Sequence, residues 1–222
     1  MTVEAVPRAF DVIRGLYFVT ADVPELGRTH EGLAVHAAAG GACIVQFRHK
    51  RFDARRLQAA RAVRDVCSAF GALFIVNDDA ALAVAACADG LHLGQSDLSA
   101  LDEWRACGRG LLGVSVSTAK EAMVAVALGA DYLGVGPIFA TGSKDDAVPP
   151  IGLDGLRRVR EAVGLPLAAI GGIAERNAAD VLAAGGDAVC VISAVAHARD
   201  PHAAARRLAD IAASVPFSGG AQ

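Results

Sequence analysis

Short apolar runs alternate with longer helical patterns along this chain, and the pair occurs eight times. The runs are rich in Val, Ile and Leu and mostly lack strict alternation with polar residues, which is typical of strands with both faces buried. The predicted strands span residues 16–20, 42–48, 73–76, 90–93, 111–116, 132–136, 166–170 and 188–191. The stretches between them are amphipathic and predict helices.

Eight strand–helix units with short connections predict an α/β fold in one domain, a closed parallel (β/α)₈ TIM barrel. We expect the barrel to cover residues 1–213 and residues 214–222 to form a disordered tail. A doubly wound sheet is the alternative, but it usually carries G-x-G-x-x-G after its first strand, and residues 20–27 have no such motif. A chain of 222 residues, 54% of them hydrophobic, suits one such domain.

Composition narrows the class of partner. The net charge of −3 gives no bulk attraction to nucleic acid or to an anionic membrane. No apolar run reaches the length of a membrane span, and no secretory signal is apparent. The five cysteines form no C-x-x-C pair and are predicted to be small buried hydrophobes. We therefore expect a cytoplasmic protein that acts on small molecules, with a homo-oligomer left open.

Polar residues cluster where the predicted strands end, which is where barrel enzymes carry their active sites. Gln46, Arg48 and Lys50 alternate at the end of the second strand, so they point the same way. Arg forks onto phosphate oxygens and Lys adds a point charge. This segment predicts a site for an anionic group.

Two carboxylates follow the next two strands. Asn77 and Asp78 end the third strand, and Asp97 follows the fourth. Adjacent strands are about 4.8 Å apart, so Asp78 and Asp97 are expected to converge. Oxygen ligands without a neighbouring Cys or His favour Mg²⁺. A general acid/base pair and helix capping remain the alternatives.

The remaining strand ends predict a second anion site. Ser115, on the fifth strand, could donate to a substrate ring. The long loop after the sixth strand carries Thr141, Ser143 and Lys144 and could close over an anion. Gly172 and Ser193 follow the last two strands, between which many barrels bind phosphate. Two anion sites at one barrel mouth suggest two phosphorylated reactants.

Two further features near these strand ends are predicted to be structural. Thr118 and Glu121 have the spacing of a helix capping box, and His92 is predicted to have a packing or supporting role.

Several of these segments together resemble the thiamine phosphate synthase family. The matching segments are 45–50 (VQFRHK), 76–78 (VND), 90–97 (GLHLGQSD), 113–115 (GVS), 134–144 (GVGPIFATGSK), 169–173 (AIGGI) and 191–194 (VISA). They lie in order between about residues 16 and 208 and include nearly every predicted strand.

The resemblance implies a (β/α)₈ barrel that joins 4-amino-2-methyl-5-(diphosphooxymethyl)pyrimidine to a thiazole ethyl phosphate and releases pyrophosphate. Asp78 and Asp97 would bind Mg²⁺, and Arg48, Lys50, Ser115 and Lys144 would act in catalysis. The residues expected to hold the pyrimidine diphosphate are Gln46, Arg48, Lys50, Asn77, Ser115 and Lys144. Those expected at the thiazole phosphate are Thr141, Ser143, Gly172, Ile192 and Ser193.

Three departures from the family pattern stand out. Asp79 replaces an arginine of many members and is expected to add negative charge beside the metal. Ser143 replaces the commoner threonine. Residues 51–52 match no pattern that we associate with the family. A thiazole tautomerase on the same barrel is the nearest alternative, but its catalytic histidine is associated with the position of Ser117. A non-catalytic phosphate-binding barrel is a third possibility.

Overall fold

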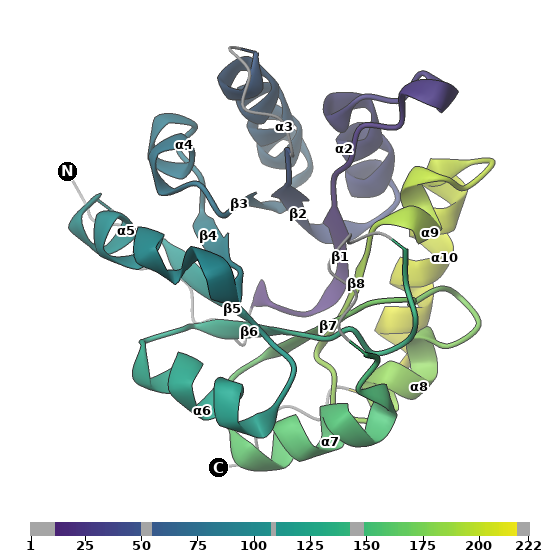
Figure 1. Cartoon of the computed structure of the whole chain (residues 1–222). Coiled ribbons are helices and arrows are strands. Elements are labelled where there is room, and N and C mark those ends of the chain that lie inside the picture. The colour runs from purple at the N-terminus through teal and green to yellow at the C-terminus, as the bar shows by residue number, and fades with distance from the viewer. Residues whose placement is uncertain (1–11, 50–54, 108–109, 143–148, 217–222) are drawn as a thin grey trace.

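Eight parallel strands close into a barrel in chain order, and helices surround them in Figure 1. The computed structural model describes residues 12–49, 55–107, 110–142 and 149–216. The strands are β1 (Gly15–Val19), β2 (Ala42–Phe47), β3 (Leu73–Asn77), β4 (Gly90–Leu93), β5 (Leu111–Val116), β6 (Tyr132–Val135), β7 (Leu167–Ile170) and β8 (Ala188–Val191). Every predicted strand is confirmed to within one residue at each end, and so is the barrel fold.

The outer helices are α2 (His30–Ala39), α3 (Arg56–Phe70), α4 (Ala80–Ala85), α5 (Leu101–Cys107), α6 (Ala119–Ala127), α7 (Gly152–Ala162), α8 (Ala178–Ala183) and α10 (Pro201–Ser214). Shorter helical turns, η1 (Pro24–Leu26), η2 (Gln95–Ala100) and α9 (Ser193–Ala196), follow β1, β4 and β8. Ser214, the first residue of the predicted tail, ends α10, and residues 217–222 lie outside the described part of the chain. Within the described residues, no helix has the length and apolar character needed to cross a membrane.

The core has two layers because side chains on a strand alternate between its two faces. One layer lies between strands and helices and contains residues such as Phe18, Val45 and Leu133. The other fills the inside of the barrel with Tyr17, Ile44, Ile75, Leu111, Tyr132 and neighbours. The interior is therefore packed with side chains, and in barrels of this kind the site lies at the carboxyl ends of the strands.

Three aspartates fasten the amino ends of the strands. Asp89, Asp131 and Asp187 immediately precede β4, β6 and β8. Each carboxylate accepts the backbone N–H of a residue on the preceding strand at 2.7 Å, and each backbone N–H donates to the carbonyl of that same residue. The partners, in order, are Phe74, Leu112 and Leu167. Neighbouring strands are thereby paired at the bottom of the barrel.

The prediction that all the cysteines are buried is wrong for three of them. Cys43, Cys87 and Cys107 are exposed, whereas Cys67 and Cys190 are buried. Apolar neighbours such as Ile44 and Ala86 are buried, but Cys43 and Cys87 occupy positions that face outward, and Cys107 ends α5 beside the exposed Ala106. Burial raises the pKa of the Cys67 thiol to about 12, so this thiol is protonated and packs as a hydrophobe.

Candidate active site

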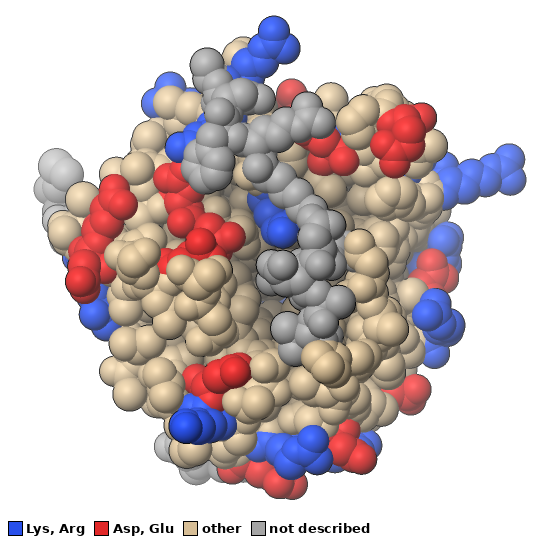
Figure 2. All heavy atoms as spheres, viewed as in Figure 1, with Lys and Arg blue, Asp and Glu red and all other residues tan. Residues whose placement is uncertain are grey.

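A cavity of about 600 Å³ lies at the carboxyl ends of the strands. Figure 2 shows a hollow at the centre of this face, with basic atoms inside it and acidic groups beside it. Nine predicted site residues line the cavity: Arg48, Asn77, Asp78, Asp97, Ser115, Thr141, Gly172, Ile192 and Ser193. Gln46 lines a second, deeper hollow of about 50 Å³, and several residues line both this deeper hollow and the cavity. Lys50, Ser143 and Lys144 lie outside the described residues.

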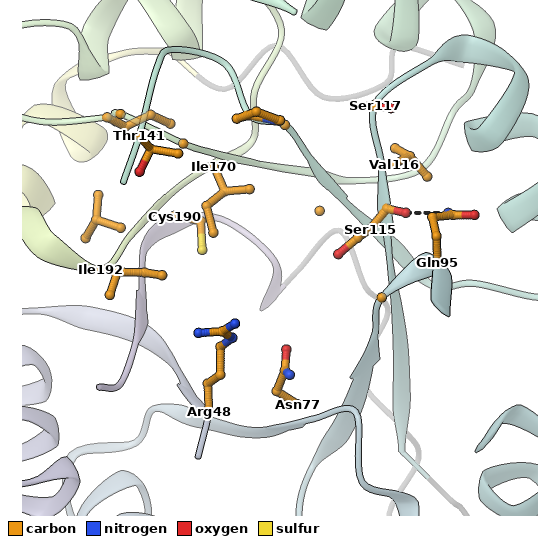
Figure 3. A pocket seen from close by; sticks show the side chains of 18 of the residues that line it. Arg48, Asn77, Gln95, Ser115, Val116, Ser117, Thr141, Ile170, Cys190 and Ile192 are labelled. Carbon is orange, nitrogen blue, oxygen red and sulfur yellow. Dashed lines mark hydrogen bonds between the residues drawn. The ribbon is translucent and has the colours of Figure 1, made fainter. Parts of the chain in front are cut away.

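The second and third strands supply a basic and an amide group to this cavity. Arg48 follows β2, where its backbone N–H donates to Thr20 Oγ1 at 3.3 Å. Asn77 ends β3, and both side chains point into the cavity in Figure 3. Gln46 is buried one layer deeper on β2, so it and Arg48 face the same side, as the alternation predicted.

Asp78 and Asp97 converge on one point. Asp78 has a left-handed backbone, with φ of 62°, and its Oδ1 accepts the Gly94 N–H at 3.0 Å. Asp97 lies in η2, and its Oδ2 accepts from Ser96 Oγ at 2.7 Å. The position that a Cβ would take on Gly94 is 2.8 Å from Asp97 Oδ2 and 3.7 Å from Asp78 Oδ1. The glycine therefore keeps open a space that both carboxylates border.

Asp79 does not add charge to this space, so that expectation is wrong. Its carboxylate caps α4 by accepting the Leu82 N–H at 2.8 Å, and it pairs with Arg56 Nη2 at 2.7 Å. The capping alternative considered for Asp78 is therefore fulfilled by its neighbour. The left-handed turn at Asp78 separates the two adjacent carboxylates and directs only one of them to the cavity.

Ser115 and the start of α6 form the next part of the wall. Ser115 Oγ lies 2.9 Å from His92 Nε2, and its carbonyl accepts from Gln95 Nε2 at 2.5 Å, the bond drawn in Figure 3. Thr118 caps α6, as predicted, by accepting the Glu121 N–H at 3.2 Å. The Glu121 carboxylate accepts hydrogen bonds from the N–H and the hydroxyl of Ser117. In the usual capping box it would accept from the N–H of the next residue, Thr118.

The loops after β6, β7 and β8 close the opposite side. Gly171 and Gly172 have φ values of 105° and 63°, a region that favours glycine. A Cβ on Gly172 would lie 2.6 Å from the Ala140 carbonyl oxygen, so the glycine lets the loop that bears Thr141 pack against it. Ser193 begins α9 and faces the same cavity. Free N–H groups of a first helical turn suit an anion.

One cluster at the barrel mouth was missed by the sequence analysis. Asp22, His30 and His49 bring three possible metal-ligand atoms within 4.8 Å of one another. His30 Nδ1 lies 2.7 Å from Thr20 Oγ1, and its Nε2 lies 3.4 Å from Asp22. Burial lowers the pKa of His30 to about 4 against the opposing effect of Asp22, so the imidazole is neutral at pH 7. Both of its nitrogens then have partners without an ion. These residues belong to different elements, and no local spacing indicated the cluster.

A closed barrel with a polar cavity and glycine-rich loops at the carboxyl ends of its strands defines a (β/α)₈-barrel enzyme. The model of the thiamine monophosphate synthase family matches residues 16–195. The chain belongs to this family, which confirms the resemblance found in the sequence.

Individual relatives agree with the family match. The thiamine-phosphate synthase of Methanoculleus marisnigri is 52% identical over 206 residues, which cover 92% of this chain and 98% of the relative. That of Chloroflexus aurantiacus is 49% identical and covers 87% of this chain and 90% of the relative. The solved thiamine phosphate pyrophosphorylase of Pyrococcus furiosus has a TM-score of 0.82 and 35% identity, and covers 91% of this chain and 96% of its own. A 3-hexulose-6-phosphate synthase, at 21% identity and a TM-score of 0.66, shares the fold alone.

Proposed function

We propose that this protein forms thiamine phosphate from 4-amino-2-methyl-5-(diphosphooxymethyl)pyrimidine and a thiazole ethyl phosphate, with Mg²⁺, and releases pyrophosphate. The family and its relatives are named for the synthesis of thiamine phosphate, in agreement with the activity expected from the sequence. The observation that carries the proposal is the convergence of the Asp78 and Asp97 carboxylates beside Gly94, in the same cavity as Arg48.

The residues present fit a magnesium ion. Asp78 and Asp97 offer the hard oxygen ligands that Mg²⁺ takes, and Gly94 leaves the space between them free. Among the described residues that line the cavity, Arg48 is the only Arg or Lys, beside the carboxylates Asp78, Asp97 and Glu121. The described part of the lining thus holds one cation and three carboxylates, and Lys50 and Lys144, which are assigned to the diphosphate from the sequence alone, lie outside it. Mg²⁺ held by Asp78 and Asp97 would neutralise negative charge on the diphosphate.

The pyrimidine diphosphate is assigned to the side of the cavity formed by β2 to β5. Arg48 can form two parallel hydrogen bonds with phosphate oxygens. Gln46 and Ser115 border the deeper hollow, where an uncharged ring fits better than a diphosphate. The full set proposed for this substrate is Gln46, Arg48, Lys50, Asn77, Ser115 and Lys144, of which Lys50 and Lys144 are assigned from the sequence alone.

The thiazole phosphate is assigned to the opposite side. Gly172 and Ser193 follow β7 and β8 and can present backbone N–H groups to its phosphate, with Ile192 between the strand and α9. The hydroxyl of Thr141 reaches the same cavity from the loop after β6. Ser143 is included in this set from the sequence alone. Separate sides for the two anions leave the reacting carbon and nitrogen to meet between them.

The reaction breaks one bond and forms one bond. The C–O bond between the pyrimidine methylene and the diphosphate breaks, and its electron pair leaves with the diphosphate. The amino group of the pyrimidine releases electron density toward the methylene carbon, and the thiazole nitrogen lone pair forms the new C–N bond. The thiazole is the nucleophile, so the chain contributes position and charge: Arg48 faces the leaving group, and the cavity holds both rings in reach.

The two alternative functions gain no support from the site. In a thiazole tautomerase the position of Ser117 would carry a catalytic histidine, whereas here the Ser117 hydroxyl donates to Glu121 at 2.9 Å. A non-catalytic barrel would have no use for two converging carboxylates at a glycine.

The test is to incubate the protein with both substrates and Mg²⁺ and to detect thiamine phosphate and pyrophosphate by mass spectrometry. We expect both products in equal amounts, and neither product when one substrate is omitted or EDTA is added. Isomerisation of a carboxylated thiazole phosphate without the pyrimidine, and no thiamine phosphate, would identify a tautomerase instead.

A further inference from the structure

A chain of hydrogen bonds crosses the inside of the barrel. Gln46 Nε2 donates to the Tyr17 hydroxyl at 2.8 Å, and the Tyr17 and Tyr132 hydroxyls lie 2.9 Å apart. The Tyr132 hydroxyl lies 3.1 Å from His92 Nδ1, and His92 Nε2 lies 2.9 Å from Ser115 Oγ. Both tyrosines are fully buried, and Gln46 and His92 are 5% and 7% exposed. These hydrogen bonds therefore connect Gln46 on β2 with Ser115 on β5, and both residues line the deeper hollow.

Two glycines make room for the imidazole of His92. Gly113 on β5 is paired with His92 on β4, and a Cβ on this glycine would lie 2.4 Å from His92 Nδ1 and 2.2 Å from Tyr132 Cζ. Gly134 on β6 is paired with Ser115, and a Cβ there would lie 2.7 Å from His92 Cε1. Side chains at these inward positions would displace the ring. The interior is thus shaped around His92.

The direction of the hydrogen bonds follows from the groups themselves. Gln46 Nε2 can only donate, so the Tyr17 oxygen accepts and its own hydrogen is available for the Tyr132 oxygen. The Tyr132 hydrogen then goes to His92 Nδ1, which accepts it and so carries no proton, and the ring proton is therefore on Nε2. If Tyr132 donated to Tyr17 instead, the buried Tyr17 hydrogen would have no acceptor among these hydrogen-bonded residues. Burial raises the pKa of both phenols, so both stay protonated and able to donate.

The last hydrogen bond fixes the hydroxyl of Ser115. His92 Nε2–H donates to Ser115 Oγ and occupies one of its lone pairs. The hydroxyl hydrogen of Ser115 therefore cannot also point at His92. Ser115 lines both the cavity and the deeper hollow. The hydroxyl hydrogen is thereby directed toward the cavity.

We propose that His92 is a positioning residue, held by Tyr132 with its proton on Nε2, which makes Ser115 a hydrogen-bond donor to an acceptor atom of the pyrimidine diphosphate. This inference rests on the proposed function, because it needs that substrate in the cavity. The acceptor is either a ring nitrogen or a diphosphate oxygen. A bond to a ring nitrogen is present in the bound substrate and lowers KM. A bond to a departing oxygen strengthens as charge develops and raises kcat.

A double-mutant cycle tests whether Tyr132 acts through Ser115. We expect Tyr132→Phe to reduce kcat/KM for the pyrimidine diphosphate about fivefold, the effect of one lost hydrogen bond. The same change in a Ser115→Ala background should have less than about a twofold effect, since no hydroxyl remains to orient. The KM of the thiazole phosphate should stay constant in all variants. Leu111→Ala, which removes an apolar side chain from the same interior layer but none of the hydrogen-bonding groups, controls for loss of stability.

Two replacements of His92 provide the second test. Glutamine can place an amide N–H near the position of Nε2, whereas asparagine is too short to reach Ser115. His92→Gln should therefore retain several-fold more activity toward the pyrimidine diphosphate than His92→Asn, at similar melting temperatures. A rise in KM across the series assigns the acceptor to the ring, and a fall in kcat assigns it to the diphosphate.

Three results would overturn the inference: wild-type kinetics for Tyr132→Phe, multiplicative losses in the double variant, or equal losses toward both substrates. Each requires a wild-type protein that makes thiamine phosphate. A wild type that makes none would instead refute the proposed function, so the two failures are distinguishable.

Discussion

Aspartates occupy both ends of this barrel, and the two groups behave differently. At the amino ends, Asp89, Asp131 and Asp187 accept main-chain N–H groups of neighbouring strands. At the carboxyl ends, Asp78 and Asp97 border one open space beside Gly94 and line the cavity. The same residue type on the same sheet thus stabilises the fold at one end and faces a ligand site at the other. Sheet polarity, rather than residue type, separates the two uses.

Asp187 shows how a carboxylate is stabilised at the amino end. Burial raises its pKa, while the Leu167 N–H and Arg160 oppose that effect. Arg160 also donates to the carbonyls of Gly185 and Leu165 at 3.1 Å, so the guanidinium ties three segments together. All of these contacts form on folding, and none involves the cavity at the other end.

The largest expected effect is at the carboxyl end. Asp97→Asn keeps the shape of the side chain but removes half of the carboxylate pair, so we expect kcat/KM to fall about a thousandfold, or about 4 kcal/mol of transition-state stabilisation. The melting temperature should stay near that of the wild type. Steady-state kinetics over a range of Mg²⁺ concentrations and a thermal melt provide the measurements. Turnover within tenfold of the wild type at unchanged Mg²⁺ dependence would refute the metal assignment.

The amino end should show the opposite pattern. Asp187→Ala removes the acceptor of the Leu167 N–H and the partner of Arg160, so we expect the free energy of unfolding to fall by about 3 kcal/mol. kcat and KM should not change under conditions where the protein is folded. Asp102→Ala, at a carboxylate that is 95% exposed, is the matched control and should change stability by less than about 0.5 kcal/mol. Urea denaturation of the three proteins measures the difference, and equal stabilities would contradict the fastening role.

The buried His30, near the carboxyl ends of the strands, should make the protein less stable in acid. The pKa of His30 is about 4 in the folded protein, below its ordinary value of 6.5, so the unfolded chain binds the proton more readily between these values. Stability therefore falls as the pH drops through this window, by about 2 kcal/mol at pH 5 relative to pH 7.5. His30→Gln should lose this part of the pH dependence. Urea denaturation of both proteins at the two pH values checks it, and an identical loss in the variant would show that other groups are responsible.

The smallest effect concerns the space between the two carboxylates. Gly94 has φ of −72° and tolerates alanine, but the new Cβ would lie 2.8 Å from Asp97 Oδ2. We expect Gly94→Ala to raise the Mg²⁺ concentration needed for half-maximal activity about tenfold, or about 1.4 kcal/mol. Gly164→Ala is the control, because a Cβ there meets no atom within 4 Å. An unchanged Mg²⁺ requirement in Gly94→Ala would place the ion elsewhere.

The sequence predicted the barrel well because strands that are buried on both faces leave continuous apolar runs, and eight such runs with helices between them have few other solutions. It also predicted which residues meet at the mouth, because the carboxyl ends of parallel strands share one edge. Asp78 and Ser193, for example, are more than a hundred positions apart in the chain and line one cavity.

The rest depended on local geometry and distant partners. Asp78 and Asp79 are adjacent and identical in type, and only the left-handed backbone at Asp78 determines which of them faces the cavity. The Tyr17–Tyr132 bond joins residues 115 positions apart, and no pattern near either tyrosine indicates the other. His92 was expected to have a packing or supporting role, but its partners became visible only in the folded barrel.

The backbone at Asp78 also limits how this site can evolve. Most side chains are disfavoured in the left-handed region, whereas Gly, Asn and Asp enter it at little cost. Random substitutions at this position are thus filtered by conformation before any selection on catalysis. A descendant that lost its need for the carboxylate would drift first to Asn or Gly and could return to Asp by a single change of residue. The left-handed turn therefore restricts this position to residues from which Asp can be restored, even after the carboxylate has been lost.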